Sequence, residues 1–279
     1  MDNKDENIKD NKEDIKPDGK VDNKADTKAD SKDSKNFVIN IEHVKKSFGS
    51  NTVLKDINLK IKEGETVVTL GKSGTGKSVI LQCIVGLLYP DEGKILVYGE
   101  NIPELDKEDL QEIRKKIGFL FQSGALYDSM TVRQNLEFPL RKLTDFNDAE
   151  INNKVKEVLQ NVGLPNAIDK MPSELSGGMK KRIGLARTLI TEPKIMLYDE
   201  PTTGLDPATS REISQLILET QKKYKVTSII VTHDMECAKL TADRMVVLKD
   251  GEYIAEGTFD ELQKSDDEFV KSFFEGLNF

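Results

Sequence analysis

Apolar and polar residues alternate near the start of the chain, over 37–41 and again over 57–61. The second run ends in a turn of charged residues and glycine at 62–65. A period of two predicts strands that bury one face, and two such strands close together in sequence favour antiparallel pairing. We therefore expect an antiparallel β subdomain at the edge of the fold.

Further along, the apolar runs become short and continuous, and stretches with helical spacing separate them. Strands that alternate with helices predict an α/β fold in which a parallel sheet carries helices on its faces. The expected strands lie over 66–70, 195–198, 226–232 and 245–248, and the expected helices lie over 79–88, ending near Pro90, from Pro207 onward, and between the last two strands.

The stretch over 123–174 interrupts this alternation and has mostly helical spacing. Its apolar residues recur three and four positions apart, which places them on one face of a helix. Gly163 then stops the pattern, as glycine commonly does at the end of a helix. We expect an inserted α-helical subdomain over about 123–174. The apolar face consists of Ile151, Val155, Val158, Leu159 and Val162.

Residues 1–36 are mostly Asp, Glu, Lys, Asn and Ser, with a loose four-residue repeat of Asp and Lys over 22–35. Such a composition cannot bury enough apolar area to offset the entropy lost on ordering. Lys and Asp also recur at helical spacing, but Pro17 and Gly19 interrupt it, and Asp and Asn are poor helix formers. We expect a disordered charged tail, and a docking segment for a partner is the alternative.

Composition and charge narrow the class of protein. A chain of 279 residues, 37% hydrophobic and 32% charged, supports one sizeable core with an inserted lobe. A formal net charge of -8 argues against nucleic acid as the main partner, because phosphate backbones require a basic surface. Cys83 and Cys237 lie far apart, so neither zinc nor a disulfide framework is indicated, and a reduced cytosolic compartment fits. No apolar run is long enough to span a membrane, so a membrane role requires a partner.

A glycine-rich loop follows the expected strand over 66–70 directly and leads into an expected helix. It fits the G-x-x-x-x-G-K-[ST] pattern that binds the phosphates of a nucleotide. The glycines let the backbone wrap around the phosphates, Lys77 places a positive charge near the outer ones, and the hydroxyl of Ser78 can hold Mg²⁺. The nucleotide-binding candidates in this loop are Gly71, Lys72, Ser73, Gly74, Thr75, Gly76, Lys77 and Ser78.

Two carboxylates, Asp199 and Glu200, follow the expected strand over 195–198 at its carboxyl end, where ligands bind in open α/β sheets. Asp199 is the candidate Mg²⁺ ligand. Glu200 would point the other way along an extended chain and is the candidate general base that polarises an attacking water. The alternative is a pair of solvated acids before the turn at Pro201.

Gln122 and His233 also follow apolar runs, over 117–121 and 226–232. The amide of Gln122 could reach Mg²⁺ or water, although a lone glutamine is usually a surface residue. The imidazole of His233 could donate a hydrogen bond to a terminal phosphate, and the alternative is a histidine with a purely structural role. Both residues are candidate catalytic groups, and Gln122 is also a candidate metal ligand.

A second glycine-rich loop, with Ser176, Gly177 and Gly178, opens a basic helix. Backbone N–H groups at the start of a helix can hold an anion, so these residues are candidates for a second contact with the nucleotide. Asp206 precedes a proline and fits a helix N-cap, and it could also face a partner subunit at the nucleotide. Phe48 could stack on an adenine ring, and the alternative is a core aromatic.

These motifs occur in the order seen in ATP-binding cassette (ABC) transporter ATPases, and the chain resembles this family over 37–265. The resemblance implies a P-loop NTPase cassette over 37–262, a helical extension over 263–279, and ATP and Mg²⁺ as cofactors. It also implies that two copies close head to tail, with each ATP held between one phosphate loop and Ser176 and Gly178 of the other copy. Loss of the γ-phosphate contacts on hydrolysis would then open the dimer.

Within that family, the segments around Gln122 and the second glycine loop resemble the ATPase subunit of bacterial phospholipid transporters of the maintenance-of-lipid-asymmetry type. Met179 stands where most cassettes have glutamine, as in that subgroup. The resemblance implies a membrane permease, a lipid-binding protein of the mammalian-cell-entry class, and a position on the cytoplasmic face of the inner membrane. Leu126 and Tyr127 would meet the permease, or else pack within the lobe.

Other functions remain open from the sequence, because the catalytic motifs are shared across the family. The same ATPase could serve an importer of amino acids or other small solutes. It could also signal to a cell-envelope partner without transport. DNA-repair and translation cassettes are not favoured, since the chain has no basic bias and no second cassette.

Overall fold

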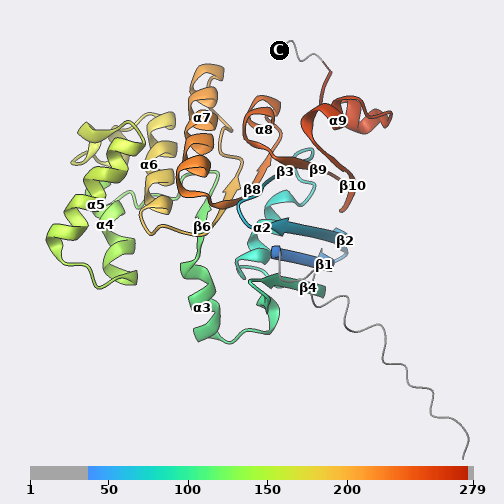
Figure 1. Ribbon diagram of the computed structural model, residues 1–279, viewed down its shortest axis with the longest axis horizontal. Helices are drawn as coiled ribbons and strands as arrows, with labels where there is room; N and C mark the ends of the chain where they lie inside the picture. The colour runs from blue at the N-terminus through green and yellow to red at the C-terminus, as the bar shows by residue number, and fades with distance from the viewer. Residues whose placement is uncertain (1–36, 276–279) are drawn as a thin grey trace, which may run out of the picture. The chain divides into compact units, whose positions relative to one another are not determined.

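The computed structural model describes residues 37–275, and their strands form a ten-stranded sheet (Figure 1). The strand order is β5-β4-β1-β2-β10-β9-β3-β8-β7-β6. The expected tail over 1–36 lies outside the described residues. The strands are β1 (Phe37–Phe48), β2 (Asn51–Lys62), β3 (Thr66–Leu70), β4 (Glu92–Val97), β5 (Glu100–Asn101), β6 (Ile117–Leu120), β7 (Ile195–Asp199), β8 (Thr227–Thr232), β9 (Arg244–Lys249) and β10 (Glu252–Gly257).

The sheet has a parallel part and an antiparallel part. Strands β6, β7, β8, β3 and β9 pair in parallel, whereas β1 pairs antiparallel with both β2 and β4. Strand β10 connects the two parts, because it pairs antiparallel with β9 and joins β2 through Glu252 and Asp56. The predicted α/β fold with a parallel core and an antiparallel β edge is confirmed.

Helices cover both faces of the parallel strands (Figure 1). Single-turn 3-10 helices lie at Ile102–Glu104, Pro165–Ala167 and Pro172–Glu174. The α-helices are α2 (Lys77–Ile84), α3 (Lys107–Lys115), α4 (Val132–Leu143), α5 (Asp148–Asn161), α6 (Gly177–Leu189), α7 (Pro207–Tyr224), α8 (Met235–Thr241), α9 (Phe259–Gln263) and α10 (Glu268–Lys271).

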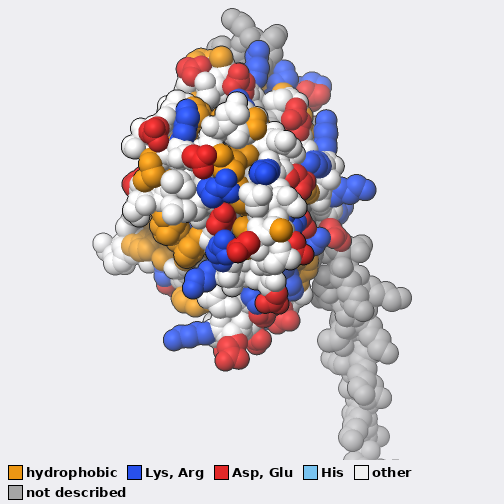
Figure 2. Space-filling model, turned by 90° about the vertical axis from the view of Figure 1, so that its left-hand side faces the viewer, with side chains coloured by type: hydrophobic (Ala, Val, Ile, Leu, Met, Phe, Trp, Pro, Cys, Tyr) orange, Lys and Arg blue, Asp and Glu red, His pale blue; other side chains and the backbone are white. Residues whose placement is uncertain are grey.

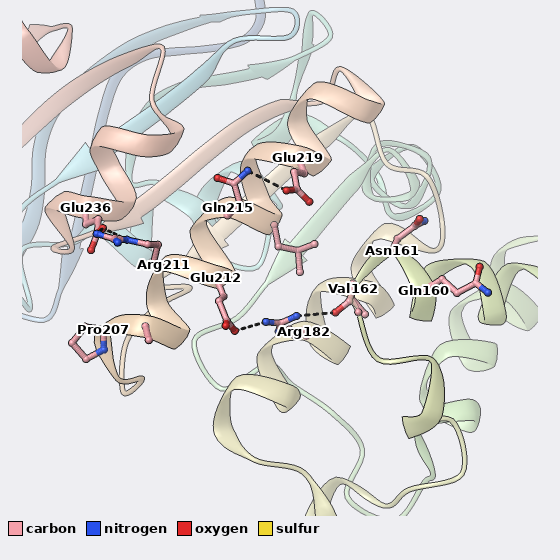
Figure 3. A pocket seen from close by; sticks show the side chains of 13 residues that line it. Gln160, Asn161, Val162, Arg182, Pro207, Arg211, Glu212, Gln215, Glu219 and Glu236 are labelled. Carbon is pink, nitrogen blue, oxygen red and sulfur yellow. Dashed lines mark hydrogen bonds and ion pairs between the residues drawn. The ribbon is translucent and has the colours of Figure 1, made fainter.

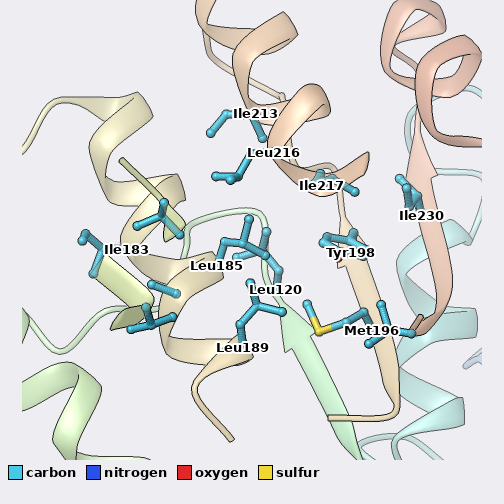
Figure 4. Packing of buried hydrophobic residues seen from close by; sticks show 14 of the residues in the cluster. Leu120, Ile183, Leu185, Leu189, Met196, Tyr198, Ile213, Leu216, Ile217 and Ile230 are labelled. Atoms are coloured by element: carbon cyan, nitrogen blue, oxygen red, sulfur yellow. The ribbon is translucent and has the colours of Figure 1, made fainter. Parts of the chain in front are cut away.

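Strand β7 shows why the sequences of the parallel strands are continuous apolar runs. Met196 and Tyr198 point into the core formed with α6 and α7, while Ile195 and Leu197 point into a second core that includes α2 (Figure 4). Successive side chains of a strand face opposite sides, so a strand between two helical layers must be apolar at every position. The motif-bearing loops therefore begin from strands that are anchored on both faces.

Helices α4, α5 and α6 gather beside β6 at one end of the sheet (Figure 1). The expected apolar face of α5 is buried from Ile151 to Leu159, and Val162 beyond the helix end is also buried. Helix α6 begins after residue 174 yet contacts α4, α5 and β6, so it links the lobe to the sheet. The side of the molecule seen in Figure 2 carries acidic, basic and apolar side chains intermixed.

The predicted helix over 79–88 is wrong at both ends. Helix α2 begins at Lys77, directly after Gly76 with φ 100°, and ends at Ile84. Gly86 then has φ 68°, in the left-handed region that glycine enters without steric cost, so the helix stops before the apolar run does.

Residues 263–275 pack against the rest of the described chain. Val270 of α10 is fully buried, and the Phe269 ring lies between Lys72 and Lys249, with Nζ atoms 5.2 and 4.8 Å from its centroid. Among residues 37–275, no helix is both long enough and apolar enough to cross a membrane.

Candidate functional site

The phosphate loop connects β3 to α2 in a conformation that requires glycine. Gly74 and Gly76 have φ 80° and 100°, and a Cβ on Gly71 would lie 2.9 Å from Thr75 Oγ1 and 3.0 Å from the Leu248 carbonyl oxygen. No side chain caps the N-terminus of α2. Its first N–H groups therefore point toward the loop without a side-chain acceptor, which suits an anion there.

Lys77 is the positive charge of this loop and is almost fully buried, with 5% of its surface exposed. Its ammonium group donates to the carbonyl oxygens of Gly71 at 2.7 Å and Lys72 at 3.1 Å, and lies 3.4 Å from Glu200 Oε1. The loop backbone thus holds Lys77 between the candidate phosphate position and the candidate general base.

Ser78 and Asp199 meet at the base of the loop, where the Ser78 hydroxyl donates to Asp199 Oδ1 at 2.7 Å. Burial raises the pKa of Asp199, because no cation fully offsets the loss of water around its carboxylate. Hydroxyl and carboxylate oxygens form the hard donor set that Mg²⁺ prefers. These residues fit a Mg²⁺ ion next to bound phosphates, and Gln122 lines the same cavity.

The expectation that Glu200 continues an extended chain is wrong. Strand β7 ends at Asp199, and Glu200 has φ 47°, in the left-handed region. Its N–H donates to the Val231 carbonyl oxygen at 2.9 Å, which ties it to β8. The turn brings the side chains of Asp199 and Glu200 to the same phosphate loop, so the two carboxylates are not on opposite sides as the alternation of a strand would require.

His233 follows β8 and contacts the same carboxylate. Its Nδ1 lies 2.9 Å from Glu200 Oε2, and the Thr203 hydroxyl donates to the same oxygen at 3.0 Å. These two contacts hold one carboxylate oxygen in place, while Oε1 faces Lys77. The contact is compatible with both interpretations of His233, since a histidine that orients Glu200 can also present its second ring nitrogen to a phosphate.

One cavity of about 450 Å³ brings these residues together, and most of its walls come from the segments that follow β3, β6, β7 and β8 at their carboxyl ends. Neighbouring parallel strands point the same way, so their carboxyl ends lie at the same edge of the sheet. Loops that are distant in sequence therefore meet at this edge. The residues that line it are Val53, Ser73, Gly74, Gly76, Lys77, Ser78, Val79, Gln122, Glu200, Thr203 and His233.

The other candidates lie outside this cavity. Ser176 caps α6, with its hydroxyl accepting from the Met179 N–H at 3.3 Å, and Gly177 follows it in the first turn. Asp206 caps α7 and accepts from Thr209, whose hydrogen bonds hold the pKa of that carboxyl below its usual range.

Phe48 sits at the β1–β2 turn with 47% of its surface exposed. Phe48 is therefore not a core aromatic, and stacking on an adenine ring stays a prediction.

Gly178 packs against the start of α7. A Cβ at this position would lie 2.5 Å from Thr209 Cγ2. Helices α6 and α7 approach so closely here that only glycine fits without a shift of one of them. The start of α6, which carries the second glycine loop, and the start of α7, which Asp206 caps, therefore lie side by side, and neither lines the phosphate-loop cavity.

Replacement of Gly178 by alanine should destabilise the protein by about 1–3 kcal/mol, the usual cost of overpacking. The double variant Gly178→Ala/Thr209→Ser should regain most of this loss, because serine lacks the clashing methyl group and keeps the hydroxyl that bonds Asp206. Urea unfolding of both variants, with Thr209→Ser alone as the control, measures the effect. Equal stability of Gly178→Ala and the parent would contradict the close approach.

Two residues near the cavity were not anticipated from the sequence. Thr203 orients Glu200, and its place in the turn after β7 offers no local signal. Lys181 is buried, with 6% of its surface exposed, and donates to the carbonyl oxygens of Gln122 and Glu200. Its spacing from Gly178 and Leu185 puts it on the buried face of α6, and a lysine on that face was a detectable signal.

A second hollow lies elsewhere, at the junction of α5, α6 and α7 (Figure 3). Arg182 spans it, donating to the Val162 carbonyl oxygen at 3.2 Å and to Glu212 at 2.5 Å. Arg211 pairs with Glu236 on its rim. Because its basic groups are already paired with acidic ones, this hollow of about 940 Å³ is a poor site for a phosphate.

Comparisons with known proteins show the family of the chain. A family model described as "ABC transporter" matches residues 54–203. A probable ribonucleotide transport ATP-binding protein of Mycobacterium leprae is 44% identical over 238 residues, which cover 85% of this chain and 69% of that protein. The intermembrane phospholipid transport system ATP-binding protein MlaF of Haemophilus influenzae is 38% identical, with coverage of 86% and 90%.

The fold is likewise similar to a solved structure. An ATP-binding cassette determined as a dimer in a post-hydrolysis state, bound to ADP and phosphate, superposes with a TM-score of 0.73 at 35% identity. The match covers 79% of this chain and 98% of that one.

Proposed function

Since the chain belongs to the ABC transporter family, whose ATPases hydrolyse ATP with Mg²⁺, we propose that it powers a bacterial transporter that moves phospholipid between membranes. In this proposal, two copies act as a head-to-tail dimer on a membrane permease at the cytoplasmic face of the inner membrane. A lipid-binding protein of the mammalian-cell-entry type completes the assembly.

The proposal of a dimer rests on one observation, the separation of the two glycine loops within one copy of the chain. The candidate base Glu200, the lysine Lys77 and the candidate metal ligands Ser78 and Gln122 line the phosphate-loop cavity. None of Ser176, Gly177 and Gly178 lines it. A second copy related by a twofold axis could supply these residues to the open side of the cavity. The relative bound to ADP and phosphate is itself a dimer.

Within one copy, each residue has a distinct task in the proposed mechanism. The phosphate loop and Lys77 bind and orient the phosphates, and Ser78 and Asp199 would hold a Mg²⁺ ion that would offset the phosphate charge. Glu200 accepts a proton from the attacking water, while Thr203 and His233 keep its carboxylate in place. In this mechanism the protein lowers the barrier to phosphoryl transfer by positioning the reactants and by offsetting charge, and it forms no covalent bond to the phosphoryl group.

Dimerisation should depend on ATP. In a Glu200→Gln background, where bound ATP persists, light scattering should show the monomer without nucleotide and the dimer with Mg²⁺-ATP. Ser176→Phe in the same background should keep ATP bound to the monomer but prevent the dimer, because the bulky ring blocks the surface around the start of α6. An unchanged dimer in that variant, or full-speed hydrolysis by a strictly monomeric protein, would rule out the composite site.

Phospholipid as cargo is supported by the relative named for intermembrane phospholipid transport. The relative named for ribonucleotide transport supports the alternative, an importer of small solutes. Purification of the tagged protein with its membrane partners distinguishes them. A lipid-binding companion with phospholipid bound favours the proposal, whereas a periplasmic solute receptor favours the alternative, and a hydrolase regulator favours signalling without transport.

A further inference from the structure

Lys181 occupies an unusual place for a lysine, in the interior between α6 and the parallel sheet. Helix α6 packs across β6 and β7 through apolar side chains such as Leu185 and Leu189 (Figure 4). Lys181 lies on this same side and is 6% exposed. It does not line the phosphate-loop cavity.

Its ammonium group donates to two backbone carbonyl oxygens, Gln122 O at 2.5 Å and Glu200 O at 3.1 Å. These residues follow β6 and β7 at their carboxyl ends. Hydrogen bonds from a charged donor are shorter and stronger than neutral ones. One side chain therefore joins the start of the loop into the lobe, the candidate general base and the helix that carries the second glycine loop.

This contact helps to hold the backbone of Glu200. Its φ of 47° is unfavourable for a residue with a Cβ, and persists only where the surroundings impose it. The N–H side is held by Val231 and the carbonyl side by Lys181. The Thr203 N–H also donates to the Glu200 carbonyl oxygen, at 3.3 Å, so the charged donor of Lys181 adds to a weaker bond within the turn.

The charges around Lys181 also favour an ammonium group there. Burial lowers its pKa, and the carboxylates of Asp199 and Glu200 act in the opposite direction. A second cation of α6, Arg187, donates to the Ala125 carbonyl oxygen at 2.6 Å, so the loop after Gln122 is held to α6 at two points. Hydrogen bonds from Lys181 and Arg187 thus connect α6 to this loop, and the bond from Lys181 also connects α6 to the Glu200 backbone.

We propose that Lys181 is a positioning residue for ATP hydrolysis, linking α6 and the Gln122 loop to the backbone of Glu200. This inference rests on the proposed role of Glu200 as the general base.

The test compares three single variants of the full-length protein. Lys181→Met keeps the length of the side chain but removes its donors and charge. Lys181→Arg keeps a cation with several donors, and Lys180→Met removes a charge from the neighbouring, more exposed position on the same helix. We expect kcat of Lys181→Met to fall about ten- to a hundredfold, as for loss of a charged hydrogen bond, with KM for ATP within about twofold of the parent. Lys181→Arg should recover part of the rate, and Lys180→Met should match the parent.

The Glu200→Gln background distinguishes a role of Lys181 in positioning Glu200 from a purely structural role. If Lys181 acts through Glu200, Lys181→Met should slow hydrolysis little further there, because effects of residues that act together are not additive. A parent-like kcat in Lys181→Met, or the same fold-loss with and without Glu200, would overturn the inference. If Lys181→Met does not fold, Lys181→Gln, which retains an amide donor without the charge, replaces it under the same criteria. Normal turnover of Glu200→Gln alone would instead refute the general base itself.

Discussion

Replacing Glu200 by glutamine should slow ATP hydrolysis by about a hundredfold or more while leaving ATP binding intact, the usual scale for loss of a positioned general base. The amide has almost the same shape and can still accept from Thr203 and His233 through its oxygen. It cannot take a proton from water at neutral pH. Steady-state phosphate release gives kcat, and a fluorescent ATP analogue gives the affinity.

The matched control for this variant is Glu256→Gln. Glu256 is an exposed acid near the end of β10 that pairs with Arg244 and does not line the phosphate-loop cavity, so the same chemical change should leave kcat unaltered. Near-normal turnover of Glu200→Gln would refute its role as base. Loss of ATP binding in that variant would show instead that the carboxylate is needed to hold the loop through Lys77.

Removal of the lysine side chain in Lys77→Ala should weaken ATP binding by about ten- to a hundredfold, because a charged hydrogen bond is worth about 1.5–3 kcal/mol. The loss has two sources. The phosphates lose a positive charge, and the carbonyl oxygens of Gly71 and Lys72 lose their donor. Calorimetric titration with a non-hydrolysable ATP analogue measures the affinity.

The control variant Lys72→Ala tests whether the loss of ATP affinity is specific to the buried charge of Lys77 or follows from removal of any lysine in the loop. The Lys72 ammonium group lies over the Phe269 ring and makes no hydrogen bond to the loop carbonyls, so its removal should change affinity much less. Equal losses in the two variants would mean that general charge, rather than the position of Lys77, determines binding. An unchanged affinity in Lys77→Ala would contradict the assignment altogether.

Local patterns predicted the elements whose residues carry their own signal. The runs at β3, β7, β8 and β9 were recognisable because a strand buried on both faces must be apolar throughout. Strand β10 was not anticipated, since its residues alternate between exposed and half-buried, and only its pairing with β9 and β2 makes it a strand. The ends of α2 were misplaced because the apolar run continues past Ile84, where the backbone already turns.

The chemistry of the site was predictable in its parts but not in its arrangement. The phosphate-loop pattern identified Lys77 and Ser78, and the acids after β7 identified Asp199 and Glu200, because such spacing has a direct chemical purpose. Their mutual distances depend on β3, β7 and β8 lying side by side, which brings together residues more than a hundred positions apart.

By itself, the sequence determined the set of reactive groups and their order along the chain. Glycine loops and acids at strand ends can be recognised from a few neighbouring residues, because their chemistry depends on the local backbone. Only the tertiary structure decided that Glu200 turns back on a left-handed backbone, that Lys181 reaches its carbonyl oxygen, and that Gly178 meets Thr209 outside the phosphate-loop cavity. These features arise from packing between segments distant in sequence, and no local pattern encodes such contacts.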